Sequence, residues 1–358
     1  MSSPLVSVVT PVYNGEEFLP QCIESVLAQT YRNWDFTIVN NCSTDGTLEI
    51  CEKYAALDRR IRVVTNSCFL KILENHNRAV SCLSPEAKYC KVLFADDWFF
   101  PNCLEELVAN AEQHPSVGIV SSYALAGDRV LWTGLPYPSH VVDGREICRR
   151  KLAGGVDVFG TPTAQLIRAD LVRKRGKLYN ESNLHADTEA CLSVLQESDF
   201  GFVHHVLSYS RPRQNSNDTF ARSFDSHILG MLAIFLKYGP LYLDQDEYRH
   251  YLGKRLKEYH RVLAKNVLRL RSSEFWRYHN ETLRACGAKI DALRVAASVP
   301  HELVAMVRRP INSMMDLMRW WREAATRAVH RPAQSAREQA PQVQGGPERQ
   351  IQPKKEPA

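Results

Sequence analysis

The sequence predicts an α/β protein with a doubly wound, mainly parallel sheet, followed by a helical C-terminal region. Short apolar runs alternate with amphipathic stretches up to about residue 95, a spacing typical of parallel strands joined by helices. The alternation changes character after about residue 120, which favours an open sheet over a closed barrel. Beyond residue 222 the pattern is almost entirely helical. The chain has 358 residues, of which 44% are hydrophobic, and this is enough for a substantial core.

The individual elements follow from local patterns. A β-branched run ends at Pro11, where a turn is expected. A helix should follow, because Leu19, Ile23, Val26 and Leu27 fall at i, i+4, i+7 and i+8 and form one apolar stripe. A polar turn, "NNCSTDGT", precedes a second helix. The four predicted strands are 5–10, 34–39, 61–65 and 89–95.

Cysteine usage and apolar run lengths predict a cytoplasmic protein. The ten cysteines include no CxxC pair, which argues against a zinc site or a disulfide scaffold and fits a reducing compartment. The apolar run Ile228–Leu236 is much shorter than the roughly 20 residues that span a bilayer. No basic residue precedes the first apolar stretch, so a cleaved signal peptide is not expected.

Charge is unevenly distributed along the chain. Residues 1–248 carry 23 Lys+Arg and 30 Asp+Glu, a net charge of −7, whereas residues 249–331 carry 18 and 7, a net charge of +11. Together with the helical pattern beyond residue 222 and the Pro- and Gln-rich composition from residue 331, this asymmetry predicts a first domain over 1–222, a basic helical region over 223–330 and a disordered tail over 331–358. No nucleic-acid-binding module accompanies the basic region, so no nucleic acid is expected as a partner.

The segment 300–331 allows two interpretations. It combines Met and Leu with the pair Trp320–Trp321 and several arginines, a composition that suits the surface of an anionic membrane. The same composition suits helices that pack on the first domain and turn a basic face to solvent. Both interpretations stay open at this point.

Polar residues follow the predicted strands and should meet at one edge of the sheet. In doubly wound sheets, ligands bind at the carboxyl ends of the strands. This places Pro11–Asn14, Asn40–Ser43, Asn66 and the acidic pair Asp96–Asp97 around one crevice. Adjacent carboxylates are suitable ligands for Mg²⁺ or Mn²⁺.

Three motifs in order resemble the family 2 glycosyltransferases. They are "VSVVTPVYNGEEFLPQCIESVLAQTY", "FTIVNNCSTDGT" and "FADDW", and the resemblance extends over about residues 4–215. It implies a GT-A fold, a nucleotide-diphosphate sugar donor, inversion at the transferred sugar, and Mg²⁺ or Mn²⁺ held by Asp96 and Asp97. The common form of the acidic motif has another Asp two positions before Asp96, where this chain has Phe94.

The resemblance also implies residues that contact the donor. Relatives line the nucleotide with the loop after the first strand, read the base with an Asp-containing pair after the second, and use basic residues further on for the base or the diphosphate. An amide pair replaces the Asp-containing pair here, so base preference is not carried over. The residues at these positions are Pro11, Val12, Tyr13, Asn40, Asn41, His76, Arg78, Asp96, Arg211 and Arg213.

The resemblance places the catalytic base in "NLHADTEACLSVL". An acceptor hydroxyl is a poor nucleophile, so a carboxylate must remove its proton as the new bond forms. Asp187 occupies the base position, Ala186 stands where relatives have Glu, and Glu189 is the alternative carboxylate. Asp187 also suits a helix N-terminus. His204 and His205 are adjacent on a predicted strand, so at most one of them could reach a metal.

These observations predict a non-processive glycosyltransferase, because the chain lacks the QxxRW motif and the membrane spans of processive relatives. The expected acceptor is a glycan or a lipid-linked glycan in surface polysaccharide or glycolipid assembly. The alternative is a catalytically silent module that binds a sugar nucleotide or recruits the chain to a membrane. The sequence contains neither GxGxxG after the first strand nor GxxxxGK[ST], which disfavours a dehydrogenase or a P-loop ATPase.

Overall fold

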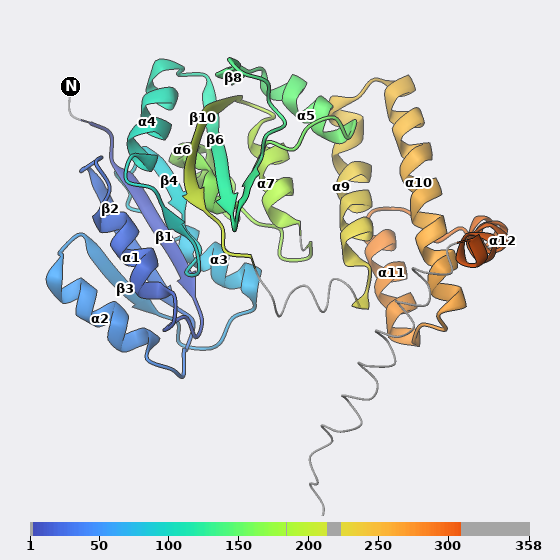
Figure 1. Cartoon of the computed structure of the whole chain (residues 1–358), viewed down its shortest axis with the longest axis horizontal. Helices are drawn as coiled ribbons and strands as arrows, with labels where there is room; N and C mark the ends of the chain where they lie inside the picture. Colours follow the sequence, from blue (N-terminus) through green and yellow to red (C-terminus); the bar gives the residue numbers. More distant parts are fainter. Residues whose placement is uncertain (1–2, 184, 213–222, 309–358) are drawn as a thin grey trace, which may run out of the picture. The chain divides into compact units, whose positions relative to one another are not determined.

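The first part of the chain folds into one mixed sheet, shown in Figure 1. The computed structural model describes residues 3–183, 185–212 and 223–308. Within them ten strands form the sheet in the order β3-β2-β1-β4-β9-β6-β10-β5, with β7 paired to β6 and β8 to β10. The strands are β1 (Val6–Val12), β2 (Trp34–Asn40), β3 (Ile61–Thr65), β4 (Tyr89–Val92), β5 (Trp98–Phe99), β6 (Val117–Ala126), β7 (Arg129–Leu131), β8 (Val141–Val142), β9 (Leu166–Arg168) and β10 (Asp199–Tyr209).

The sheet is mainly parallel, as the sequence predicts. The β1–β2, β2–β3, β1–β4 and β6–β10 pairs are parallel. The short β9 is antiparallel to both β4 and β6 and so joins the two parallel halves. Each of the four predicted strands is present, and the fold class is confirmed.

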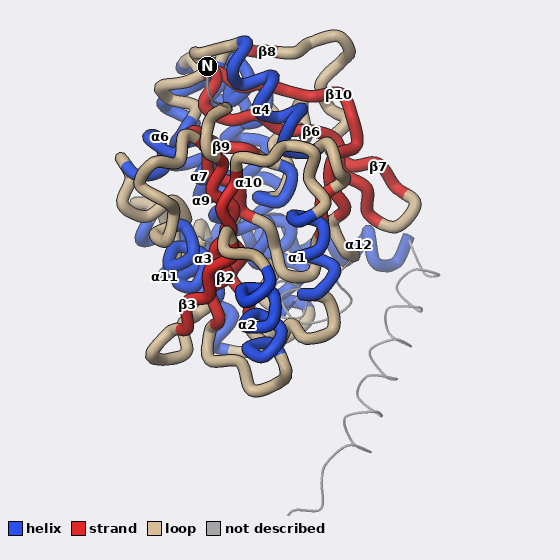
Figure 2. Tube along the Cα trace, turned by 90° about the vertical axis from the view of Figure 1, so that its left-hand side faces the viewer, coloured by secondary structure: helices blue, strands red, loops and turns tan. Residues whose placement is uncertain are grey.

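Helices cover both faces of the sheet, and Figure 2 shows α1 and α2 on the opposite side of the strands from α6, α7 and α9 (Ser226–Tyr242). One face packs against α1, α2 and α4. The other packs against α3, α5, α6, α7 and α9. The helices that precede the C-terminal region are α1 (Leu19–Leu27), α2 (Thr47–Leu57), α3 (Ile72–Val80), α4 (Cys103–Gln113), α5 (Gly144–Leu152), α6 (Ala169–Arg173) and α7 (Ala186–Val194), with a short 3-10 helix, η1 (Pro162–Ala164).

The apolar stripe predicted for the first helix faces the sheet. Leu19, Ile23 and Val26 of α1 are completely buried. Burying each of these side chains contributes about 1.5–3 kcal/mol relative to leaving it exposed. The periodicity of the sequence therefore fixes which side of α1 meets the strands.

Pro11 differs from its predicted position. The sequence predicts that the strand stops there, but β1 continues through Pro11, which pairs with Val39, to Val12. β1 pairs with β4 only from Val6 to Val9, and Leu93 N donates to Val9 O. Alternate residues of β1 face alternate neighbours, so the missing N–H of Pro11 is directed to the side where β4 has already left the ladder.

The C-terminal region is helical as far as it is described. Its helices are α9 (Ser226–Tyr242), α10 (Gln245–Leu268), α11 (Ser273–Ala285) and α12 (Ala292–Arg308). α9 contributes Phe235 and Tyr238 to the core of the sheet domain, and its other side packs with α10 and α11 around Tyr259 and Phe275. None of the helices in the described ranges is long and apolar enough to span a bilayer.

The predicted division of the chain falls partly outside the described residues. The described residues up to Val299 form one compact unit, and those from Pro300 belong to a second. The boundary near residue 222 lies at the end of 213–222, and both 309–331 and the tail 331–358 also lie outside the described residues. The three-part division and the surface role of 300–331 therefore stay predictions.

Candidate functional site

The carboxyl ends of the parallel strands form the site. Val12 and Asn40, the last residues of β1 and β2, are partners in the sheet, and Asn40 also pairs with Thr65 at the end of β3. The loops that follow are joined directly, since Asn41 N donates to Val12 O at 2.8 Å. The predicted crevice thus begins where three strands end together.

Asp97 is the most firmly held carboxylate at this edge. It is 4% exposed. Its Oδ2 accepts from Thr163 Oγ1 at 2.6 Å and, at 3.5 Å, from Ser210 Oγ, while its Oδ1 accepts from Arg211 N at 2.9 Å. The donors come from η1 and from the segment after β10. Asp97 therefore fixes both segments against the end of β4.

Arg211 lies beside the acidic pair, and its contact with the donor stays a prediction. Its Nε donates to the Asp96 carbonyl at 3.2 Å, and its Nη2 donates to Gln21 Oε1 at 3.1 Å. The guanidinium also lies 4.0 Å from the centre of the Phe18 ring, a cation–π contact. Arg213 lies outside the described residues.

The acidic pair fits a divalent cation that takes most of its ligands from elsewhere. In the described part of the chain, no three His, Cys, Asp or Glu side chains converge to hold a metal ion. His204 bonds Tyr123 and the Ser139 carbonyl through its two ring nitrogens, and His205 is exposed and pairs with Glu106. Asp96 is only half-buried. A hard cation that uses one or two carboxylates and completes its shell with phosphate oxygens and water suits this donor set.

Asn41 holds together the loops that follow β2 and β3. Its amide Nδ2 donates to Leu70 O at 2.8 Å, and its Oδ1 accepts from Leu70 N and from Asn66 Nδ2, both at 2.9 Å. Asn40 accepts from Ser43 N at 3.1 Å. Both amides are buried and hold the loops after β2 and β3 in place. Direct contact between these two amides and a nucleotide stays a prediction.

An exposed aromatic pair stands beside these loops. Tyr13 is 48% exposed and Phe69 is 59% exposed, and their rings meet edge to face at 4.9 Å. Leu70, which Asn41 holds, directly follows Phe69. Phe69 did not stand out in the sequence, because its pairing with Tyr13 depends on the loop that Asn41 fixes.

The two candidate bases differ sharply in their surroundings. Asp187 lies in the first turn of α7 and is half-buried, and its Oδ1 accepts from Thr188 N at 2.7 Å. Burial raises the pKa of the Asp187 carboxyl. Glu189 is 4% exposed and pairs with Lys237 of α9 at 2.6 Å, and its second oxygen accepts from Asn180 at 2.9 Å. Glu189 therefore joins α7 to α9, and the role of Asp187 as the base stays a prediction.

A continuous line of contacts connects the acidic pair to α7. Thr163 bonds Asp97, and two residues later Gln165 Nε2 lies 3.3 Å from Cys191 Sγ in α7. Gln165 also donates to the carbonyls of Phe159 and Gly160. The segment 160–165 thus contacts both the acidic pair and α7.

Known proteins match this architecture. The family model described as "Glycosyl transferase family 2" matches residues 7–176. GlyG, a glycosyltransferase of Streptococcus pneumoniae serotype 4, is 31% identical over 224 residues, which cover 60% of this chain and 73% of GlyG.

The chain belongs to glycosyltransferase family 2.

Solved structures agree with this family in fold. Staphylococcus aureus TarS 1–349 in complex with UDP-GlcNAc matches with a TM-score of 0.58 and 17% identity, covering 90% of this chain and 92% of TarS 1–349. The mannosyltransferase PcManGT from Pyrobaculum calidifontis, in complex with GDP-Man and Mn²⁺, matches with a TM-score of 0.51 and 14% identity, covering 92% and 88% of the two chains. The sheet and its helices therefore form a GT-A fold.

Other curated relatives are matched only in part. The chain spans 55% of the length of EpsE and 40% of TuaG, both from Bacillus subtilis (strain 168), at 33% and 37% identity. The segments matched are 41% and 29% of this chain.

Departures from the common family 2 pattern have structural explanations. Phe94 stacks on His76 of α3 at 5.1 Å, so the position of the extra Asp is used for an aromatic contact. Arg78, two residues along α3, is exposed and bonds Ser81 at 3.3 Å. Ala186 is 1% exposed within the core, where a Glu would bury a charge.

Lys91 is a buried cation that sequence reasoning missed. It is completely buried in β4, its Nζ donates to Thr163 O at 2.6 Å, and it lies 4.7 Å from the centre of the Phe99 ring. Thr163 in turn donates to Asp97. Burial lowers the pKa of Lys91 from 10.5 to about 8. A lysine within an apolar run was the available signal.

We expect Lys91→Met to change how stability depends on pH. Below pH 8 both states hold the proton, and the folded protein bears the full cost of a buried ammonium. Between about 8 and 10.5 the unfolded chain keeps a proton that the folded chain has released, so the free energy of unfolding of the wild type rises relative to Lys91→Met. The slope approaches about 1.4 kcal/mol per pH unit.

Denaturant unfolding at about pH 7 and about pH 9.5 measures this difference. Lys88→Met is the control, because Lys88 lies three residues earlier with a half-exposed side chain paired to Glu112. If the free energies of unfolding of the wild type and Lys91→Met change by the same amount between the two pH values, the lowered pKa of Lys91 is contradicted.

Proposed function

We propose that this chain is a metal-dependent, inverting glycosyltransferase that moves a sugar from a nucleotide-diphosphate donor to an acceptor hydroxyl. The observation that carries the proposal is the cluster of Asp96, Asp97 and Arg211 at the carboxyl edge of the sheet. Such a cluster pairs a cation-binding acidic pair with a permanent positive charge, the combination that a departing diphosphate requires. Family membership supports the reaction class.

Each of these residues has a separate role in the proposed reaction. Asp96 and Asp97 would hold Mg²⁺ or Mn²⁺, which when bound offsets negative charge on the diphosphate. Arg211 is fixed by its bonds to Asp96 and Gln21 and adds positive charge on the same side. Asp187 takes the proton of the acceptor hydroxyl, and its raised pKa makes it a stronger base than an exposed Asp. The transition state is oxocarbenium-like, as in glycosidases.

The nucleotide is bound on the side of β1 to β3. Tyr13 and Phe69 offer exposed aromatic surface for a base, and Asn41 sets the position of that surface through Leu70. The TarS structure is a complex with UDP-GlcNAc, and the PcManGT structure is a complex with GDP-Man and Mn²⁺. The name of TuaG refers to teichuronic acid biosynthesis. These support a nucleotide-diphosphate sugar donor and a role in surface polysaccharide assembly.

Asp187→Asn should abolish transfer and leave donor binding unchanged. Removing a general base typically costs about 10²–10⁴-fold in turnover. Calorimetric titration with the UDP- or GDP-sugar that raises the melting temperature most should give the same Kd for the variant and the wild type. In the wild type, the acid limb of kcat should lie above the usual Asp pKa, because only the deprotonated carboxylate accepts the proton and burial raises its pKa.

Glu189→Gln separates the alternative base from the proposed one. Lys237→Met is the matched control, because it breaks the same ion pair from α9. Both variants should lose similar stability and keep measurable turnover, whereas Asp187→Asn keeps its melting temperature and loses turnover. Full turnover by Asp187→Asn, or loss of turnover only in Glu189→Gln, would overturn the assignment of Asp187.

Chelation tests the acidic pair. Treatment with EDTA should abolish activity, and added Mn²⁺ or Mg²⁺ should restore it. Asp96→Asn should weaken Mn²⁺ binding, measured directly by electron paramagnetic resonance, and Asp128→Asn, in the turn between β6 and β7, is the control. Activity that is indifferent to chelator would remove the metal from the proposal.

Phe69→Ala should weaken donor binding severalfold. Loss of an aromatic stacking contact costs about 0.5–1.5 kcal/mol. Ile72→Ala is the matched control, since Ile72 is three residues away and 52% exposed. Equal donor Kd values for both variants would mean that the nucleotide base does not stack on Phe69.

A further inference from the structure

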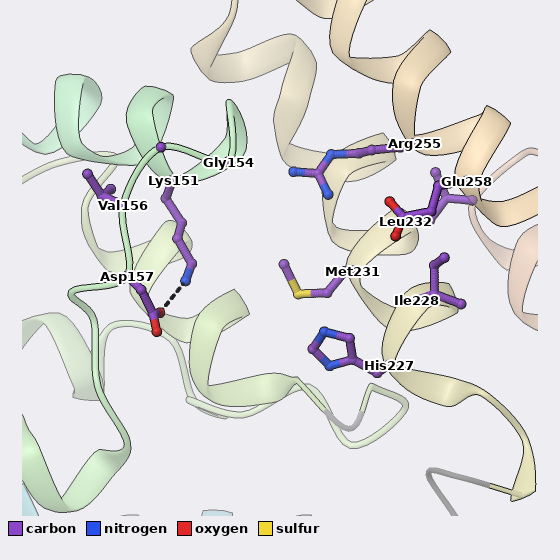
Figure 3. Close-up of a pocket in the computed structure, with 11 residues that line it drawn as sticks. Lys151, Gly154, Val156, Asp157, His227, Ile228, Met231, Leu232, Arg255 and Glu258 are labelled. Atoms are coloured by element: carbon purple, nitrogen blue, oxygen red, sulfur yellow. Dashed lines mark hydrogen bonds and ion pairs between the residues drawn. The ribbon is translucent and has the colours of Figure 1, made fainter. Parts of the chain in front are cut away.

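A cavity of about 450 Å³ lies within the first unit, between the end of α5 with its following loop and helices α9 and α10. Figure 3 shows the side chains that surround it. Cavities of this size bind small ligands. Charged and polar side chains share its wall with the apolar Ile228, Met231 and Leu232. The polar lining residues are Lys151, Asp157, His227, Arg255 and Glu258.

Arg255 is a partly buried cation whose contacts are with neutral groups. Its Nη2 donates to Leu152 O at 2.7 Å, and its guanidinium lies 4.7 Å from the centre of the Phe235 ring. Figure 3 shows the guanidinium directed across the cavity toward α5. Burial lowers the pKa of Arg255, and Glu258 acts on it in the opposite direction. Within the described chain, no ion pair joins Arg255 to a carboxylate. A buried cation is costly unless an anion accompanies it.

Lys151 brings a second cation to the cavity from α5. Its side chain is 16% exposed and its Nζ lies 2.9 Å from Asp157 Oδ1, whereas the side chain of Asp157 is 67% exposed. Glu258 is likewise exposed. The cations therefore lie inward and the carboxylates at the solvent margin. A planar guanidinium and an ammonium facing the same space are well placed to bind an oxyanion through charge-assisted hydrogen bonds.

The cavity adjoins the helix that carries the proposed base. Burial raises the pKa of Asp187, and the positive charge of Lys151 opposes part of this rise. His185, directly before α7, meets His227 edge to face at 4.6 Å, and His227 lines the cavity. Nε2 of His185 is buried and has no hydrogen-bond partner among the described residues. A ligand in this cavity would therefore lie beside the N-terminus of α7.

We propose that this cavity binds an oxyanion of the acceptor, a phosphate or a carboxylate, through Arg255 and Lys151. The inference rests on the proposed function, because it assigns an acceptor group to a cavity next to the proposed base. The apolar wall of Met231, Ile228 and Leu232 accommodates the carbon skeleton that bears the anion. The acceptor is accordingly an acidic glycan or a phosphate-bearing one.

Binding of simple anions tests the proposal directly. Inorganic phosphate and D-glucuronate are titrated separately into the wild type at constant ionic strength, and the imidazole resonances of His227, assigned with His227→Asn, are followed by NMR. At least one anion should shift them. Arg255→Met should weaken that binding by about tenfold or more, because it keeps the stack on Phe235 and removes the charge.

Arg249→Met is the matched control on the same helix, since Arg249 is 72% exposed and pairs with Asp246. It should bind the anion as the wild type does. Arg255→Lys keeps a charge without the planar fork and should bind with intermediate affinity. It also provides a folded comparison if Arg255→Met is unstable, with circular dichroism and melting temperature reporting the fold of each variant.

The outcomes separate this inference from the proposed function. Binding of phosphate alone identifies a phosphate-bearing acceptor, and binding of glucuronate alone identifies a uronate. Failure of both anions to shift His227, or equal affinity in Arg255→Met and Arg249→Met, overturns the subsite. A wild-type protein that binds no UDP- or GDP-sugar in the presence of Mn²⁺ overturns the proposed function, whatever the anions do.

Discussion

The buried carboxylate of Asp97 is the constraint on which the site depends. A charge that is 4% exposed must be compensated by hydrogen bonds, and the structure supplies them from Thr163 and from the backbone of Arg211, which are 66 and 114 residues away in sequence. Holding Asp97 therefore also fixes η1 and the chain after β10. Arg211 reaches the Asp96 carbonyl because its own backbone N–H is bound to Asp97. Lys91 of β4 stabilises the same arrangement, because its Nζ donates to the carbonyl of Thr163.

Local sequence patterns predicted the first four strands and the buried side of the first helix, because these depend on neighbouring residues. The β-branched runs became β1 to β4, and the stripe of α1 meets the sheet through Leu19, Ile23 and Val26. The antiparallel β9 has only three residues and lies between β4 and β6. Three residues are too few for their pattern to indicate which strands they pair with. Pro11 misled for a related reason. Whether a proline ends a strand depends on whether its N–H side still has a partner, and that is a property of β4.

The site shows the same division between local and distant information. The resemblance prefers Asp187 to Glu189 as the base, and the ion pair to Lys237, 48 residues further on, gives Glu189 a structural role that the sequence does not show. Asn41 occupied a predicted nucleotide position, yet its amide holds Leu70 and thereby sets the place of Phe69. Sequence motifs indicated which loops follow the parallel strands β1, β2 and β3, because strand ends are local features. They could not divide the residues of these loops between those that shape the crevice and those that face a ligand.

The net charge of the basic region does not show which of its Lys and Arg side chains are exposed to solvent. Residues 249–331 hold 18 Lys and Arg, and Arg249, Lys254 and Lys257 of α10 are exposed, as a solvated or membrane-facing surface would require. Arg255 is different, because it precedes the buried Tyr259 and Leu263 by four and eight residues and so stands on the buried stripe of α10. A leucine there would complete the stripe at lower cost than a cation. The proposed anion in the cavity accounts for this arginine, whereas the exposed face of Arg249, Lys254 and Lys257 does not include it.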